Sequence, residues 1–153
     1  MHNFHWFTTI RNPFEINVSL WKFIATFESH PDHATVKEQS FEQFLAWLQE
    51  VGWQRWQPGM QWQIVNAPRR PRYLTISNFL CDEEGNLLVD RVMRQESFAE
   101  DYRLLSKDYD LPKELPHLNV TQHDSYRDYY SPTSKALIEH HHADDLEKFN
   151  YSF

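Results

Sequence analysis

Residues 4–23 of this chain read FHWFTTIRNPFEINVSLWKF, and this stretch decides the fold that we expect. The run Phe4–Ile10 is rich in aromatic and β-branched residues, as is typical of a strand that is buried on both faces. Asn12 is a favourable helix N-cap, and Pro13 suits the first helical position because its missing N–H costs nothing there. The stretch therefore predicts a strand, then Arg11, then a helix whose apolar surface packs on a sheet.

The junction between this strand and this helix is a suitable place for an anion. Ligands of open α/β sheets bind at the carboxyl ends of the strands, where a helix N-terminus offers free N–H groups. Arg11, directly before this helix, adds a guanidinium that can form charge-assisted hydrogen bonds with an anion. The alternative is a solvated Arg11 beside a buried strand and a well-capped helix.

Composition narrows the class of protein. A chain of 153 residues is long enough for one domain with a substantial core. The net charge of -7 argues against a general affinity for nucleic acid or anionic membranes. Cys81 is the only cysteine, so no internal disulfide can form. The three glycines are too few to build a Gly-rich phosphate loop. Neither a membrane-spanning run nor a signal peptide is evident, so we expect a cytoplasmic protein without a membrane segment.

The rest of the chain reads as helices and one hairpin. The polar segment Ser29–Gln39 is expected to be an exposed loop. Two strands, Tyr73–Cys81 and Asn86–Met93, are predicted on either side of a turn that ends at Gly85. Three further helices are predicted from their caps, which are Ser40 with Gln43, Ser97 with Glu100, and Ser131 with Pro132.

Aromatic and basic residues gather between residues 51 and 72. Trp56, with its neighbouring tryptophans, is either core filler or part of a stacking platform for a sugar or another acceptor. Arg69 and Arg70 lie in a basic loop that meets an anionic acceptor or is simply solvated.

The run His140–His142 lies beside Glu139, Asp144 and Asp145, which raises the question of a metal site. Consecutive residues of a helix point about 100° apart, so three adjacent histidines cannot converge on one ion. We therefore expect a solvated polar face here, and no metal.

Four blocks, in the same order, resemble sulfotransferases that use 3′-phosphoadenosine 5′-phosphosulfate (PAPS), a class that includes the carbohydrate sulfotransferases. Two positions depart from the family pattern, because Ile16 stands where a second arginine is common and Asn150 stands where glycine is usual. The matching blocks are Arg11-Asn12-Pro13 with Ser19, Arg94-Gln95-Glu96 with the following Ser-Phe-x-Glu-Asp, Leu115–Thr121, and Asp144–Tyr151.

The resemblance implies a P-loop-NTPase-like α/β fold, a parallel sheet flanked by helices, as a single partial domain over residues 1–153. It implies that PAPS is the co-substrate and that sulfuryl transfer occurs to a hydroxyl or amine, for example of a glycan or small molecule. In the family the arginine and serine of the first block hold the 3′-phosphate. The residues implied here are Arg11, Ser19, Asn119 and Thr121 for the nucleotide, and Trp56, Arg69 and Arg70 for the acceptor.

The family's phosphosulfate-binding loop and catalytic base precede the Arg-x-Pro motif, whereas only ten residues precede Arg11. The resemblance therefore implies an N-terminally truncated domain that is inactive in transfer by itself. The alternative is a non-catalytic nucleotide-binding or protein-interaction module derived from a sulfotransferase. In either case the strand Phe4–Ile10 would have an open edge, through which we expect self-association.

Overall fold

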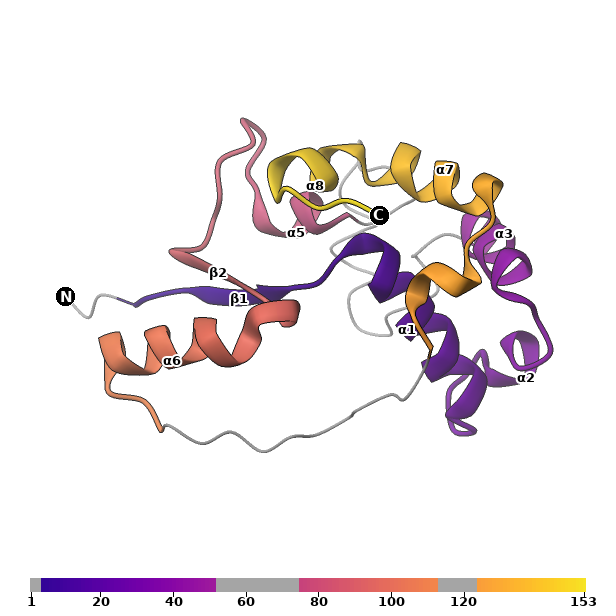
Figure 1. Cartoon of the computed structure of the whole chain (residues 1–153), viewed down its shortest axis with the longest axis horizontal. Helices are drawn as coiled ribbons and strands as arrows, with labels where there is room; N and C mark the ends of the chain where they lie inside the picture. Colours follow the sequence, from indigo (N-terminus) through magenta and orange to yellow (C-terminus); the bar gives the residue numbers. More distant parts are fainter. Residues whose placement is uncertain (1–3, 52–74, 113–123) are drawn as a thin grey trace.

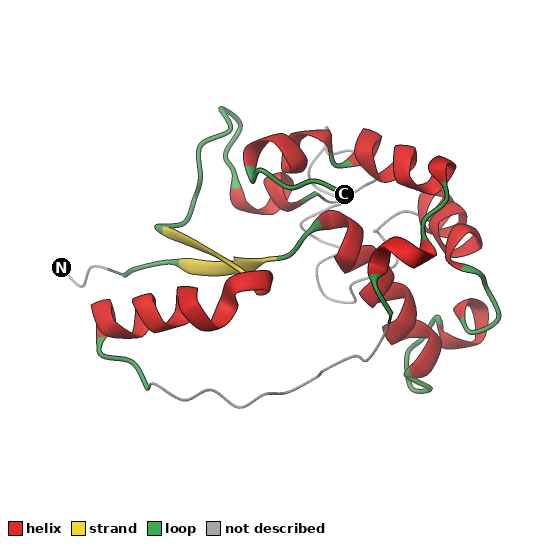
Figure 2. Ribbon diagram, viewed as in Figure 1, coloured by secondary structure: helices red, strands yellow, loops and turns green. Residues whose placement is uncertain are grey.

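The computed structural model describes residues 4–51, 75–112 and 124–153. Within these ranges the chain is a mixed α/β protein with a two-stranded parallel sheet and several helices (Figures 1 and 2). The strands are β1 (Phe7–Ile10) and β2 (Arg91–Arg94). The helices are α1 (Pro13–Thr26), α2 (His33–Val36), α3 (Phe41–Val51), α5 (Ile76–Leu80), α6 (Phe98–Tyr109), α7 (Pro132–His141) and α8 (Ala143–Lys148), with 3-10 turns η2 (Gln95–Ser97) and η3 (Tyr126–Tyr129).

The sheet lies at one end of the molecule. β1 and β2 run in parallel, with Phe7 opposite Arg91 and Ile10 opposite Arg94. Helix α6 lies along the pair and contacts β2 (Figure 1). Ile10 and Met93 are buried in the sheet, and Leu105 is buried in α6. A parallel pair followed by helices agrees with the α/β class expected from the sequence.

The main hydrophobic core lies between helices instead. Helix α1 continues from β1 and packs with α2, α3 and α7 (Figure 1). The expectation that the apolar surface of α1 packs on the sheet is therefore wrong, because the buried residues of α1, Phe14, Val18 and Ile24, lie in the helical core. The buried residues of this core are Phe14, Val18, Ile24, Val36, Phe41, Phe44, Leu45, Leu48 and Ile138.

The first strand is much more exposed than its sequence suggests. Phe4, Trp6 and Phe7 are 79%, 65% and 50% exposed, and only Ile10 is buried. The prediction of a strand buried on both faces is wrong in this structure, because β1 has β2 as its only strand neighbour in the described residues.

Self-association through the open edge of β1 stays a prediction. An unpaired strand edge beside exposed Phe4 and Phe7 is a template for pairing with another chain. We expect light scattering after size-exclusion chromatography to show dimers or larger species at tens of micromolar. Phe7→Lys places a charge on this edge and should restore a monomer. A monodisperse monomer of the unmodified chain would contradict the prediction.

The predicted hairpin is wrong in its first strand. Ile76–Leu80 forms helix α5, and β2 pairs with β1 rather than with this segment. Of the expected pairing, the described residues keep an antiparallel bridge between Cys81 and Leu87 and a hydrogen bond of 2.8 Å from the Leu88 N–H to the Leu80 carbonyl. The turn itself is confirmed, since Gly85 has φ +84° and its N–H donates to the Asp82 carbonyl at 3.1 Å.

Two of the predicted caps are confirmed. Ser40 and Gln43 form a reciprocal capping box at the start of α3, with bonds of 2.8 and 3.3 Å. Ser131 is the N-cap of α7, which begins at Pro132, and the Ser131 hydroxyl accepts from the Ser134 N–H.

Two other local predictions are wrong. Ser97 precedes α6, but its hydroxyl donates to Asp101 at 2.9 Å instead of forming a box with Glu100. The segment expected as a loop, Ser29–Gln39, contains the short helix α2, whose Val36 is buried in the core.

Across the described ranges, no helix has both the length and the apolar character needed to cross a membrane.

Candidate functional site

The junction between β1 and α1 is built around Asn12. Its side-chain oxygen accepts from the Phe14 N–H at 3.0 Å, which caps α1 as the sequence predicts. Its side-chain amide donates to the Ser152 carbonyl at 2.9 Å, and this bond ties the junction to the end of the chain. The start of α1 is therefore fixed both by the Asn12 cap and by the hydrogen bond from Asn12 to the end of the chain.

Glu96 supports the same junction from the end of β2. One of its carboxylate oxygens accepts from the Asn12 N–H at 2.6 Å, and the other accepts from the Tyr151 hydroxyl at 3.1 Å. Arg94 places its guanidinium 4.8 Å from the centre of the Tyr151 ring and donates to the Phe149 carbonyl. The Arg94-Gln95-Glu96 block thus joins the sheet, the candidate site and the C-terminal tail.

Tyr151 is held in its protonated form. Burial raises the pKa of its phenol well above the ordinary value, and the neighbouring Glu96 carboxylate raises it further. The hydroxyl therefore remains a hydrogen-bond donor to Glu96 across the physiological pH range.

Arg11 follows β1 and lies against the first turns of α1. Its Nη1 donates to Ser19 Oγ at 3.1 Å, and its Nη2 donates to Glu15 Oε1 at 2.8 Å. About a quarter of each of the Arg11 and Glu15 side chains is exposed, 26% and 24% respectively. The structure thus brings together Arg11 and Ser19, the two residues that the sequence singles out.

Glu15 is a further partner of Arg11 that is not among the predicted site residues. The two residues are four positions apart, the spacing at which opposite charges meet on a helix, so this spacing could have predicted the ion pair. Among the residues that the structure describes, no hydrogen-bond acceptor lies within reach of the buried Nε of Arg11. The guanidinium therefore has donor capacity beyond its two observed bonds.

The other predicted site residues cannot be placed beside this pair. Asn119 and Thr121, expected at the nucleotide, lie outside the described residues. The same holds for the expected acceptor residues Trp56, Arg69 and Arg70.

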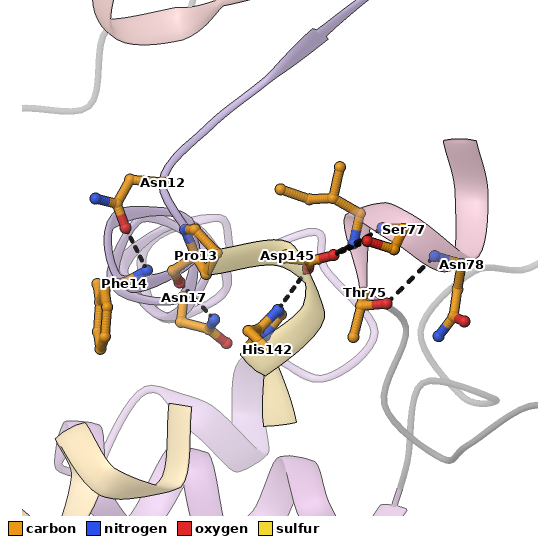
Figure 3. A network of polar contacts seen from close by, with 10 residues as sticks. Asn12, Pro13, Phe14, Asn17, Thr75, Ser77, Asn78, His142 and Asp145 are labelled. Carbon is orange, nitrogen blue, oxygen red and sulfur yellow. Dashed lines mark hydrogen bonds and ion pairs between the residues drawn. The ribbon is translucent and has the colours of Figure 1, made fainter. Parts of the chain in front are cut away.

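A second polar cluster forms where α8 meets α5. Asp145 is fully buried and accepts from the backbone N–H groups of Ile76 and Ser77 at 2.8 and 2.7 Å. Its carboxylate also accepts from the Ser77 hydroxyl at 2.7 Å and lies 2.9 Å from His142 Nδ1. Thr75 is the N-cap of α5, and its hydroxyl oxygen accepts from the Asn78 N–H (Figure 3).

This arrangement corrects the expectation of a solvated polar face for His142 and Asp145, whereas Glu139, His140 and Asp144 are exposed as expected. Asp145 and His142 are buried, and together they hold the first turn of α5. His141 is partly exposed and forms a hydrogen bond with Gln49 at 2.9 Å. Within the described ranges, no three or more histidine, cysteine or acidic side chains are grouped so that they could hold a metal ion.

The charge of Asp145 is set by two opposing effects. Burial by itself raises the pKa of this carboxyl, but the hydrogen bonds from His142, Ser77 and the Ile76 N–H together outweigh it and hold the pKa below its usual value. The carboxylate is therefore ionised at neutral pH and acts as an anionic cap on α5.

Comparison of the chain with protein-family models, with curated proteins and with solved structures found no significant match. The residues and geometry of the β1–α1 junction therefore have to support a functional assignment by themselves.

Proposed function

We propose that this chain binds a nucleotide that carries a 3′-phosphate, PAPS or its product adenosine 3′,5′-bisphosphate, through Arg11 and Ser19. The observation that supports the proposal is the 3.1 Å hydrogen bond between Arg11 Nη1 and Ser19 Oγ. This bond holds the guanidinium of Arg11, which follows the carboxyl end of a parallel strand, beside the hydroxyl of Ser19 on α1. Anions commonly bind at that position in α/β proteins.

The chemistry of the pair suits a phosphate. A guanidinium recognises phosphate with two parallel hydrogen bonds that are strengthened by charge. Ser19 accepts from Arg11 and keeps its own hydroxyl hydrogen, which it can donate to a phosphate oxygen.

The proposal extends to sulfuryl transfer within a P-loop-NTPase-like domain. The parallel β1–β2 pair and the helix that follows β1 are compatible with that architecture. In this assignment Arg11 and Ser19 anchor the nucleotide, and Asn119 and Thr121 complete its pocket. Trp56, Arg69 and Arg70 would meet the acceptor, a hydroxyl or amine of a glycan or small molecule. No residue is assigned as the catalytic base.

We expect Arg11→Ala to weaken the binding of adenosine 3′,5′-bisphosphate by about 1.5–3 kcal/mol, because one charge-assisted hydrogen bond is lost. Ser19→Ala should weaken binding by less, about 0.5–1.5 kcal/mol, since it removes a neutral hydrogen bond. Isothermal titration calorimetry measures both effects directly.

Arg103→Ala is the matched control for Arg11→Ala. It also removes an arginine paired with a nearby glutamate, but on the exposed surface of α6, so nucleotide affinity should not change. Adenosine 5′-phosphate, which has no 3′-phosphate, should bind more weakly than the bisphosphate to the unmodified chain. Equal affinity for the two nucleotides would refute the assignment.

A further inference from the structure

We propose that Glu15 is a built-in competitor of the ligand phosphate at Arg11. This inference rests on the proposed function and adds a residue that sets the affinity of the site. The Glu15 carboxylate accepts from Arg11 Nη2 at 2.8 Å, so it takes a donor that a phosphate would use.

The geometry of the guanidinium shows why Glu15 is a poor substitute for a phosphate. Nε–H and Nη2 form one edge of the guanidinium, and this edge binds oxyanions with two parallel bonds. Glu15 engages Nη2 through a single oxygen, while the buried Nε on the same edge has no acceptor among the described residues. Ser19 accepts from a different nitrogen of the guanidinium, Nη1. A phosphate that replaces Glu15 can satisfy both donors of the edge.

Charge requires that Glu15 leaves when the phosphate binds. A phosphate monoester carries roughly -1.5 to -2 charges at pH 7, and a carboxylate at contact distance from it would be repelled. The Glu15 side chain is 24% exposed, so a rotation can move its carboxylate into water. The energy of the lost Arg11–Glu15 pair is then subtracted from the binding energy of the ligand.

Glu15→Gln and Glu15→Ala are therefore expected to bind adenosine 3′,5′-bisphosphate more tightly than the unmodified chain. Partly exposed ion pairs have modest strength, which corresponds to an increase in affinity of about two- to fivefold. Titration calorimetry at constant ionic strength measures this increase. Affinity for adenosine 5′-phosphate should stay constant, since that ligand brings no phosphate to Arg11.

Glu28→Gln is the matched control, because it makes the same change in net charge just beyond the far end of α1. Glu15 and Thr26, the last residue of α1, are eleven residue steps of about 1.5 Å apart, roughly 16 Å along the helix, so the long-range effect of Glu28 on the Arg11–Glu15 pair is largely screened. This variant should bind both nucleotides with unchanged affinity. Circular dichroism should show that all variants retain the helical content of the unmodified chain.

The outcomes separate this inference from the proposed function. If Arg11→Ala weakens binding but the Glu15 variants bind equally or less tightly than the unmodified chain, Glu15 is a positioning partner of Arg11 and the inference is wrong. If the unmodified chain and every variant bind the bisphosphate and adenosine 5′-phosphate with equal affinity, the proposed function fails, and the inference fails with it. Tighter binding by both Glu15 variants, restricted to the ligand with a 3′-phosphate, supports the inference.

Discussion

Replacing Asp145 by alanine is expected to lower the free energy of unfolding by about 3–5 kcal/mol, as is usual when one partner of a buried charged network is removed. Asp145 is fully buried and accepts hydrogen bonds from Ile76, Ser77 and His142. Alanine would leave two backbone N–H groups at the start of α5 without their acceptor, and each such group carries a desolvation penalty. It would also leave the buried His142 without this carboxylate.

Urea unfolding followed by circular dichroism measures this change, with Asp144→Ala as the matched control. Asp144 precedes Asp145 in α8 but is exposed, so its removal should cost less than about 1 kcal/mol. Asp145→Asn keeps the volume of the side chain but not its charge. Its free energy of unfolding should lie between those of Asp145→Ala and Asp144→Ala. If Asp145→Ala and Asp144→Ala were equally stable, the capping role of Asp145 would be excluded.

The same carboxylate predicts a dependence of stability on pH. Its pKa is lowered in the folded protein, so its contribution is present above the unfolded value of 3.8 and is lost as the pH falls through the folded value. The unmodified chain should therefore lose stability in acid more steeply than Asp145→Ala does. Unfolding curves between neutral pH and about pH 3 provide the comparison.

Replacing Phe14 by alanine is expected to destabilise the fold by about 3–5 kcal/mol, the usual cost of deleting a buried aromatic ring. Phe14 is completely buried at the start of α1. Its ring meets the rings of Tyr130 and Phe153 edge-on, with centroids 5.5 and 5.0 Å away. The Tyr130 hydroxyl also donates to the Phe14 carbonyl at 2.9 Å, so the ring and the backbone of this residue anchor the same neighbour.

Ile16→Ala is the matched control, because Ile16 lies two residues further along α1 and is 41% exposed. Surface substitutions of this kind usually change stability by less than about 0.5 kcal/mol. Thermal and urea unfolding of both variants measure the difference. A similar, small effect for both would mean that Phe14 does not anchor the C-terminal segment to α1.

Local features could be predicted from the sequence because their partners are a few residues away. Asn12 caps α1 through the N–H two residues later, and Ser40 and Gln43 complete each other three residues apart. The residues of the candidate anion site follow the same logic, since Arg11 and Ser19 are separated by about two helical turns. Such contacts form within a short run of backbone, so residue types at a fixed spacing in the sequence are enough to predict them.

The tertiary structure decided the features whose partners are distant in sequence. The residues Ile76–Leu80 form a helix rather than a strand, and the carboxylate that accepts from their first N–H groups belongs to Asp145, 68 residues beyond Ser77. Likewise β2 pairs with β1 rather than with its sequence neighbour, and the Glu96 that follows it reaches Asn12 across 84 residues. A strand-like composition indicates only that a segment fits a pleated and partly buried surface.

The sequence by itself thus determined the caps at Asn12, Ser40 and Ser131 and the turn at Gly85, and the resemblance to a family motif singled out Arg11 and Ser19 as a pair. Only the tertiary structure decided that α1 packs into a helical core, that β1 remains exposed, and that Asp145 is buried. The physical reason is that burial depends on which surfaces meet, and those surfaces come from segments that no local pattern connects. Apolar periodicity shows that a face will be covered, whereas the folded chain determines what covers it.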